Sequence, residues 1–401
     1  MSHPTTALIH HPYQPPEGFG APQPGVFKAS TVFFPCVAAM RNHEWKDKSA
    51  YTYGLHGTPT SYMLEERIAS LEGAGQCLLV PSGLAALALV ALSLLKSGDE
   101  VLVPDNVYGP HKSLVEGELL GWGISHQYYD PMDPQDLEAQ ISSRTKLVWL
   151  EAAGSVTLEF PDIVEMVSIC QRRKVLTALD NTWGAGLAFA PFDLLPGAAP
   201  AVGVDICAHA LTKYPNGGGD VLMGSVTTRD EALHLKLKLT HMRLGLGVGM
   251  NDVESVLRGL PSMALRYKAH DAAARELAAW AQTQPEFVQV MHPALPESPG
   301  HGHWMALTGG AEGTAAGLFS VMLDSRYSQA QVDAFCDALR LFRLGYSWGG
   351  PISLVVPYDL AAMRSGWPVH LLPGTLVRFA VGLEHVADLQ ADLAQALLTL
   401  R

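Results

Sequence analysis

The chain has 401 residues, 48% of them hydrophobic and 16% charged, which is enough apolar material to bury a large core. Lys and Arg number 27 and Asp and Glu 39, and the resulting net charge of −12 argues against nucleic acid or anionic lipid as a partner. The five cysteines are scattered without any CxxC spacing, which argues against a disulfide framework or a zinc site and favours a reducing, cytoplasmic setting.

The elements expected along the chain fall into three parts. Residues 1–59 open with a stretch rich in Pro, Gly and His that lacks an apolar period, which predicts an extended N-terminal arm. Over residues 60–250, apolar strand-like runs alternate with helical patterns, which predicts βαβ units in a mainly parallel sheet. Residues 251–401 begin with a long helical stretch and are predicted to form a smaller α+β domain. The fold class is therefore expected to be α/β.

The strand-like runs of the middle part are apolar on successive residues. Helices are therefore expected to cover both faces of the sheet. The longest apolar stretch, residues 84–95, is too short for a membrane-crossing helix, which needs roughly 20 residues. It is typical of a buried core helix, and no membrane span is expected. The predicted strands are residues 77–82, 100–104, 146–151, 175–181, 204–211 and 221–228.

Lys213 is the first candidate for a chemical role. The apolar run 204–211 leads directly into Thr212 and Lys213, and a glycine-rich turn follows. Most lysines at strand ends are solvated. A lysine buried there would have a lowered pKa, which supplies the neutral amine that Schiff-base chemistry requires.

Two further features follow strands of the same predicted sheet. Asp180 ends the apolar run 175–181, near the carboxyl edge where open α/β sheets bind ligands, and a carboxylate there could keep a pyridinium nitrogen protonated. Residues 78–95 form a strand, a Ser-Gly turn and a helix, an arrangement that can bind phosphate through the first helical amides. Taken singly, each is also compatible with an ordinary turn.

Taken in order, these features resemble the Cys/Met-metabolism family of fold-type I pyridoxal-phosphate enzymes, from about residue 25 to the end. The resemblance implies a large α/β domain of the PLP-dependent transferase type, a smaller C-terminal domain, pyridoxal 5'-phosphate as cofactor and a small sulfur amino acid as substrate. No metal is implied. The motifs that carry it are YTYGLHGTPTSYMLEERIASLEG (51–73), PSGLAA (81–86), EAAGSVTLEF (151–160), LDNTWGAG (179–186), ALTKYPNGGGDV (210–221), YSWGGPISL (346–354) and GTLVRFAVGLEHVADLQADL (374–393).

The resemblance also implies roles for the residues that would hold the cofactor. Lys213 would bind it as a Schiff base and later move the substrate's Cα proton. Asp180 would bind the ring nitrogen. The amides of Gly83 and Leu84, with the Thr212 hydroxyl, would bind the phosphate.

Other matched positions are implied to complete the pocket. Tyr108 would stack on the cofactor ring, and Tyr53 would reach in from a neighbouring subunit, which requires a homo-oligomer, by resemblance a dimer of dimers. Arg378 would bind the substrate α-carboxylate through the paired hydrogen bonds that a guanidinium offers. Ser347 and Trp348 would line the same end of the pocket.

Within the family, the segments 151–160 and 346–354 are more similar to cystathionine β-lyases. That similarity implies β-elimination of L-cystathionine to homocysteine, pyruvate and ammonia. Cystathionine γ-synthase or γ-lyase activity stays open, as does a broader cysteine-S-conjugate lyase, because these enzymes share the scaffold, the lysine and the aspartate.

Two positions depart from the family pattern. Many members carry an arginine two residues after the tyrosine of the YxYG segment, which donates to the phosphate across the subunit boundary, but this chain has Leu55. His56 or Tyr53 could compensate. Ala210 stands three residues before the lysine, where serine is common. Weaker hold on the phosphate is therefore expected.

A serine hydrolase is the alternative from another class. Residues 345–349 satisfy GxSxG around Ser347, with His370 and His385 downstream. A nucleophile elbow needs a helix directly after the serine, whereas Gly-Pro and a strand-like run follow here. The pattern is therefore expected to be fortuitous.

Overall fold

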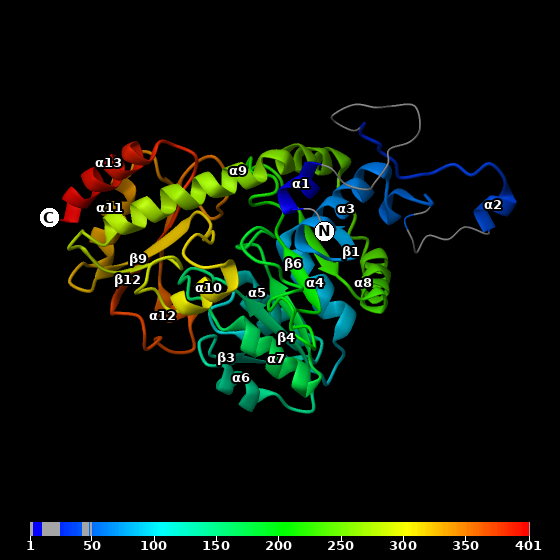
Figure 1. Ribbon diagram of the computed structural model, residues 1–401, viewed down its shortest axis with the longest axis horizontal. Coiled ribbons are helices and arrows are strands. Elements are labelled where there is room, and N and C mark those ends of the chain that lie inside the picture. Colours follow the sequence, from blue (N-terminus) through cyan, green and yellow to red (C-terminus); the bar gives the residue numbers. More distant parts are fainter. Residues whose placement is uncertain (1–2, 10–24, 42–47, 49, 401) are drawn as a thin grey trace.

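The computed structural model describes residues 3–9, 25–41, 48 and 50–400, and shows two sheets bridged by one long helix (Figure 1). The larger sheet has seven strands in the order β1-β7-β6-β5-β4-β2-β3. The strands β6, β5, β4, β2 and β3 run parallel, and β7 is antiparallel to both its neighbours. The strands are β1 (Gln76–Val80), β2 (Glu100–Pro104), β3 (Ser125–Tyr129), β4 (Thr145–Glu151), β5 (Leu176–Asp180), β6 (Ile206–His209) and β7 (Gly224–Thr228). The predicted α/β fold class is confirmed.

Both faces of this sheet are buried, as the continuous apolar runs predict. In β1, Leu78 packs in one core cluster and Leu79 in the other, and the same alternation holds for Trp149 and Leu150 in β4. Helices cover each face: α3 (Pro59–Glu72), α4 (Gly83–Leu94), α5 (Gly109–Leu114), a π-helical turn (Val115–Leu119), α6 (Pro134–Gln140), α7 (Ile163–Arg173) and α8 (Glu231–Leu244).

Local signals explain where the helices near the sheet's carboxyl edge begin. Thr58 and Ser61 form a reciprocal capping box at the start of α3, and Gly73 ends that helix with φ of 73°. The Ser82 hydroxyl caps α4 by accepting from the Ala85 amide at 3.0 Å. Because Ser82 directly follows β1, this cap fixes the first turn of α4 at the sheet edge.

Helix α9 (Met250–Ala281) runs from the large sheet to the second sheet, which lies at the C-terminal end of the molecule in Figure 1. That sheet has five strands in the order β10-β11-β12-β9-β8. Its elements are β8 (Phe287–Met291), α10 (His301–Thr308), β9 (Leu318–Asp324), α11 (Gln329–Ala338), β10 (Arg343–Leu344), β11 (Leu354–Tyr358), α12 (Leu360–Met363), β12 (Gly374–Ala380), α13 (Val386–Leu397) and a final 3-10 turn (Leu398–Leu400). The domain boundaries after residues 59 and 250 stay a prediction.

The N-terminal part differs from the expected extended arm where the structure describes it. Residues Pro4–Ile9 form helix α1, and Leu8 is buried against α3 and α9. Burial by distant helices stabilises this short helix, a cause that no local pattern reveals. Residues 25–41 do leave the body as an arm that ends in α2 (Val37–Arg41), while 10–24 and 42–47 lie outside the described residues. The 3-10 turn Gly54–His56 follows.

Strands β3 and β8 were missed by the sequence analysis. Both lie at a sheet edge, and their residues, SHQYY and FVQVM, mix polar with apolar side chains. These two strands are only partly buried, so they lack the continuous apolar run that marked the predicted strands.

Among the described residues, no helix combines the length and apolarity needed to cross a membrane. The described part of the chain also holds no cluster of three or more His, Cys, Asp or Glu side chains suited to a metal ion.

Candidate active site

Lys213 lies in the turn after β6, with its side chain largely buried. The turn is fixed by the backbone, because the Lys213 amide donates to Ala210 O at 3.1 Å and its carbonyl accepts from the Gly217 amide at 2.8 Å. The amine Nζ donates to Ser347 Oγ at 2.7 Å. Burial and the charge of Arg378 lower the pKa of Lys213 to about 8, although Asp180 opposes them. At neutral pH a larger fraction of this amine is neutral than in an ordinary lysine, which favours it as a nucleophile and base.

Asp180 ends β5 at the same edge of the sheet. Its Oδ1 accepts from the Thr182 amide at 3.0 Å and from the Thr182 hydroxyl at 2.5 Å. Its Oδ2 accepts no hydrogen bond from the described residues, so one oxygen stays available to a ligand. Burial raises the pKa of Asp180, while the Thr182 bonds and nearby His209 and Lys213 act to lower it.

The turn between β1 and α4 forms a cradle for an anion. Ser82 engages the amides of Ala85 and Ala86, and no described group accepts from the amides of Gly83 and Leu84. A Cβ on Gly83 would lie 2.7 Å from Ala210 Cβ, so a residue without a side chain is required there. The two free amides suit a phosphate.

Thr212 is less free than the resemblance implies. Its hydroxyl donates to Met223 O at 3.2 Å and accepts from the Met223 amide at 3.1 Å. The single hydroxyl proton is therefore engaged within the protein. A phosphate role for Thr212 stays a prediction, and it requires the hydroxyl to turn away from Met223.

Arg378 lies in β12, nearly fully buried, and faces the same region from the second sheet. Its Nη2 donates a long 3.5 Å bond to Ser347 O, and its guanidinium lies 5.4 Å from the Tyr358 ring centroid. Its buried Nε has no hydrogen-bond partner among the described residues. A buried guanidinium with an unused donor is suited to a carboxylate ligand.

The loop that carries Ser347 and Trp348 packs directly on the lysine turn. The Trp348 ring centroid lies 5.4 Å from Lys213 Nζ and 5.5 Å from the Tyr214 ring centroid. A Cβ on Gly349 would lie 3.0 Å from the Tyr214 amide nitrogen, so the close approach needs glycine. Ser347 adopts φ of 135°, a conformation that side chains other than glycine rarely take.

The serine-hydrolase alternative has no support in this geometry. The residues after Ser347 form a turn and then strand β11, where an elbow would have a helix. Ser347 Oγ is bonded to Lys213, and the His370 ring donates to Glu159 Oε1 at 2.6 Å. His385 begins α13 as its N-terminal flanking residue.

Tyr108 stands at the same edge, just before α5, and its side chain is 41% exposed. Its amide donates to Glu151 Oε2 at 2.9 Å. Burial, with the charges of Asp180 and Glu151, raises the pKa of Tyr108, so its hydroxyl stays protonated at neutral pH. The position suits the predicted stacking role.

Tyr53 lies apart from this group within the single chain. It is 47% exposed, and it lines a groove with Lys28, Leu55 and residues 247–252. No described contact joins it to Lys213, Asp180 or Arg378. Its role in a neighbouring subunit stays a prediction.

Two buried glutamates that the sequence analysis did not single out lie near this edge of the sheet. Glu151 ends β4 beside Asp180, and burial together with Asp180 raises its pKa well above the ordinary value. It follows an apolar run just as Asp180 does, so the same signal could have found it. Glu159 gives no such signal, because only tertiary packing surrounds it with donors.

Glu159 links two distant parts of the chain by hydrogen bonds: residues 364–370, which precede β12 of the second sheet, and the turn before Tyr108. Its oxygens accept from Arg364 Nη2 at 3.0 Å, His370 Nε2 at 2.6 Å, Asn106 Nδ2 at 2.7 Å and Thr157 Oγ1 at 2.8 Å. Although burial acts to raise it, the bonds and charges of His370 and Arg364 lower the pKa of Glu159 to about 2. The carboxylate is therefore ionised and well paired.

These groups fit pyridoxal 5'-phosphate end to end. The cradle at Gly83 and Leu84 suits the phosphate, and the free oxygen of Asp180 suits the ring nitrogen. Lys213 follows β6, which lies between β1 and β5 in the sheet, so the turn that carries the amine comes between the cradle and Asp180 along the sheet edge. Arg378 adds a carboxylate site beside the amine. Fold and site together define a pyridoxal-phosphate-dependent α/β enzyme that acts on amino acids.

The chain belongs to the Cys/Met metabolism family of PLP-dependent enzymes, whose sequence profile matches residues 5–398. It is 39% identical over 393 residues to a putative cystathionine β-lyase of Rhizobium johnstonii, covering 97% of this chain and 94% of the relative. It is 34% identical over 388 residues to an L-alanine/L-glutamate racemase of Wolbachia pipientis, covering 94% and 93%. The crystal structure of cystathionine γ-synthase from Xanthomonas oryzae superimposes with a TM-score of 0.86 at 27% identity, covering 100% of this chain and 98% of that one. The predicted family, cofactor and enzyme class, a PLP-dependent carbon–sulfur lyase, are confirmed.

Proposed function

We propose that the enzyme cleaves L-cystathionine by β-elimination to homocysteine, pyruvate and ammonia. The observation that carries the proposal is the chain of contacts from Arg378 through Ser347 to Lys213, with distances of 3.5 Å and 2.7 Å. A guanidinium suited to a carboxylate, beside an amine of lowered pKa, supports the proposal. The name of the Rhizobium relative and the segments 151–160 and 346–354 support a β-lyase over other members of the family.

The proposed roles follow from what each side chain can do. Arg378 would bind the substrate α-carboxylate and orient Cα toward Lys213. The Lys213 amine would then take the Cα proton, and Asp180 would keep the cofactor ring nitrogen protonated. When bound, the cofactor supplies an electron sink for the pair left at Cα. The protonated Tyr108 hydroxyl, or the ammonium of Lys213, would deliver a proton to the departing sulfur.

Product analysis tests this proposal directly. Purified enzyme loaded with cofactor is incubated with L-cystathionine, and the keto acid and the thiol are identified by chromatography. Pyruvate with homocysteine is expected. 2-Oxobutyrate with cysteine would show γ-cleavage instead, and the same assay with S-alkyl cysteines and cystine measures how broad the lyase is.

An amino acid racemase is the second candidate, favoured by the Wolbachia relative. Racemisation needs a base that removes the Cα proton and an acid that returns one to the opposite face, and Lys213 and the protonated Tyr108 could form such a pair. Incubation with L-alanine or L-glutamate followed by chiral chromatography decides it. Formation of D-isomers faster than pyruvate from cystathionine would favour the racemase.

We also propose that the enzyme works as a homo-oligomer, a dimer of dimers, in the cytoplasm. The exposed Tyr53 and the projecting arm 25–41 support an assembly in which one chain completes the site of another. All five cysteines are free, four of them buried, which agrees with a reducing setting.

A further inference from the structure

The groove beside Leu55 is lined by a part of the chain that the active site described above does not use. It has a volume of about 620 Å³. One wall is the start of the arm, Lys28, Ala29 and Ser30, a second is the turn from Tyr53 to Leu55, and the third is residues 247–252. The groove therefore contains the position where relatives carry a phosphate-binding arginine and this chain has leucine.

The arm beside the groove is held in place on both sides of Lys28. The Phe27 amide donates to Thr60 Oγ1 at 2.8 Å, and Ser30 O accepts from the Gly54 amide at 2.8 Å. A Cβ on Gly54 would lie 1.8 Å from Ala29 O, so glycine is required for this close contact. Lys28 and the turn that carries Leu55 consequently form one ordered edge.

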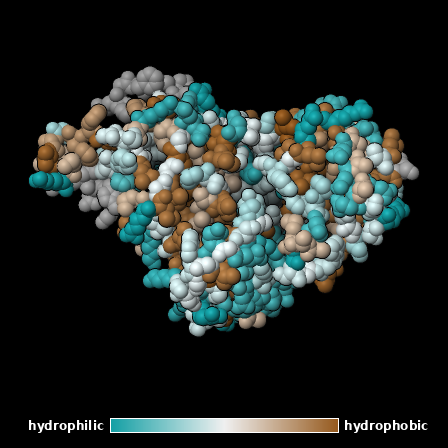
Figure 2. All heavy atoms as spheres, turned by 180° about the vertical axis from the view of Figure 1, so that it is seen from behind, coloured by the Kyte–Doolittle hydropathy of each residue, from teal (hydrophilic) through white to brown (hydrophobic). Residues whose placement is uncertain are grey.

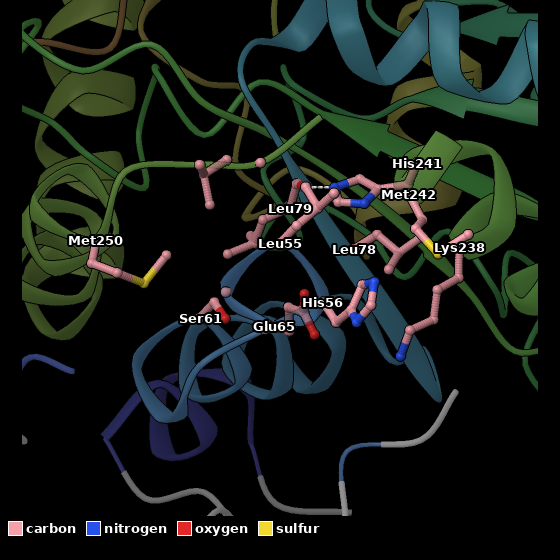
Figure 3. A pocket seen from close by; sticks show the side chains of 14 residues that line it. Leu55, His56, Ser61, Glu65, Leu78, Leu79, Lys238, His241, Met242 and Met250 are labelled. Carbon is pink, nitrogen blue, oxygen red and sulfur yellow. Dashed lines mark hydrogen bonds between the residues drawn. The ribbon is translucent and has the colours of Figure 1, made fainter. Parts of the chain in front are cut away.

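His56 does not replace the missing charge. Its Nδ1 is bonded to Thr52 Oγ1 at 2.6 Å. Burial and the charge of Lys238 lower its pKa, so the ring is neutral at physiological pH. The ring also belongs to a different cavity of about 30 Å³, shown in Figure 3, which it lines with Glu65 and Lys238.

Lys28 is the only cationic side chain among the described residues that line the groove. It is exposed, and no ion pair within 4 Å joins it to an acid of the described chain. Asp252, on the opposite wall, is the only acid of the lining. The groove thus offers a cation that is not already neutralised by contact with its own chain.

Within the part of the chain that the structure describes, no Lys or Arg side chain hydrogen-bonds to Ser82, Ala210 or Thr212 at the phosphate end of the site. The hydrogen-bond partners of Ser82, Ala210 and Thr212 are backbone groups and hydroxyls, and Ala210 has no hydroxyl to add. A phosphate carries about −1.5 to −2 charges at neutral pH, so amides alone leave much of it uncompensated.

The arm has the character of a surface that meets another chain. It leaves the body toward α2 (Figure 1), and apolar side chains lie exposed along it (Figure 2), with Phe33 93%, Val37 56% and Met40 54% exposed. An apolar segment of this kind is typically covered by a protein partner. The occupant that fits is a second copy of this chain, because the phosphate of its bound cofactor would match the charge of Lys28.

We propose that Lys28 of one copy binds the cofactor phosphate held by a second copy, and so takes over the role of the arginine that Leu55 replaces. The inference rests on the homo-oligomer named under the proposed function. It does not depend on which sulfur substrate the enzyme cleaves.

Cofactor affinity is the first test. Apoenzyme is titrated with pyridoxal phosphate by absorbance, and size-exclusion chromatography with light scattering confirms the assembly. Lys28→Ala is expected to raise the cofactor Kd about ten-fold or more and to weaken its dependence on salt, while Lys28→Arg stays near the parent. Lys268→Ala, at an exposed lysine on α9, is the matched control. An unchanged Kd for Lys28→Ala in an intact oligomer would overturn the proposal.

Two further variants decide where Lys28 acts. In the double variant Lys28→Ala with Leu55→Arg, the arginine is expected to restore the parent Kd, and no restoration would show that the two positions serve different ligands.

The second experiment co-expresses differently tagged Lys28→Ala and Lys213→Ala chains, which form a hetero-oligomer. Some of its sites combine Lys213 of one chain with Lys28 of the other. A tight-binding fraction with the visible band of bound cofactor is expected, and its absence would place Lys28 in its own chain's site. Neither readout requires cystathionine turnover, so a failure of the proposed reaction is recognised separately.

Discussion

The Lys213 amine and the Ser347 hydroxyl, 134 residues apart in sequence, are joined by a hydrogen bond of 2.7 Å. Through it the lysine turn after β6 contacts the loop before β11, which also carries the carbonyl that Arg378 reaches. The proposed base and the proposed carboxylate-binding group are therefore both hydrogen-bonded to one loop. The predictions below test the members of this arrangement and the packing that supports it.

Lys213→Ala removes the amine that is proposed to bind the cofactor and to act as the base. Turnover is expected to fall by at least the factor of about 10²–10⁴ that a positioned acid or base provides. The visible absorption band of the bound cofactor is expected to disappear, and Lys146→Ala, at an exposed lysine, serves as the control. A variant that kept the parent spectrum would end the assignment of Lys213.

Ser347 can be tested with two variants that separate its hydrogen bond from its backbone strain. Both Ser347→Ala and Ser347→Gly lose the bond to Lys213, so kcat/KM is expected to fall about five-fold, the equivalent of roughly 1 kcal/mol. Only glycine is relaxed at φ of 135°, so Ser347→Gly is expected to unfold with about 1 kcal/mol more free energy than Ser347→Ala. Equal stability of the two variants in urea titrations would contradict the strain.

Arg378→Lys keeps a positive charge but loses the planar fork of donors. Because a charge-assisted hydrogen bond contributes about 1.5–3 kcal/mol, kcat/KM is expected to fall roughly 10- to 150-fold. Most of the change should appear in KM, measured by steady-state kinetics with any substrate that proves active. Arg258→Lys, on the exposed face of α9, should leave KM as it is; a loss confined to kcat would argue that Arg378 does not bind the ground-state carboxylate.

In the cofactor-free protein, the buried amine of Lys213 should make the free energy of unfolding depend on pH. The pKa of Lys213 is about 8 in the fold and about 10.4 in the unfolded chain, so between these values the unfolded state binds more protons and stability rises with pH. Below pH 8 the cost of the buried charge, up to about 3 kcal/mol, is fully present. Urea unfolding of the apoproteins should therefore find Lys213→Met more stable than the parent at pH 7, by a margin that shrinks at pH 9.5. A margin independent of pH would refute the lowered pKa.

Glu159→Gln tests the paired carboxylate that joins the two parts of the chain. Its pKa of about 2 lies below the unfolded value near 4.3, so its stabilisation is present above pH 4.3 and is lost as the pH falls toward 2. The variant removes the negative charge that faces Arg364 and His370 and leaves Arg364 paired with Asp105 alone, at 3.4 Å. At pH 7 it is expected to lose about 3 kcal/mol of unfolding free energy. Denaturant titrations at pH 7 and pH 3 should show the difference narrowing at the lower pH. Glu254→Gln, in an exposed ion pair on α9, is the control.

Much of the site could be predicted from the chain because its residues follow strands. Lys213 and Asp180 each come at or just after an apolar run, and parallel strands place their carboxyl ends at one edge. The Ser-Gly turn before α4 was visible for the same reason. The resemblance to a family then supplied Arg378, Ser347 and Tyr108, whose positions next to these strands no periodicity predicts.

Other features depend on contacts between distant segments. Leu8 is buried by α3 and α9, and Glu159 meets Arg364 across 205 residues of sequence. His56 lines the smaller cavity with Glu65 and Lys238, whereas the groove beside Lys28 is lined without it. None of these relationships has a local signature, since each depends on which side chains a neighbouring element brings near.

The sequence by itself therefore determined most strands of the larger sheet, the two-faced burial of that sheet and the choice of Lys213 as the candidate lysine, because periodicity and turn chemistry act over a few residues. Only the tertiary structure decided that the pKa of Lys213 falls to about 8, that Arg378 keeps an unused donor and that Lys28 stands in the groove beside Leu55. Desolvation and charge act through space, and a linear pattern does not specify which groups the packed chain brings together.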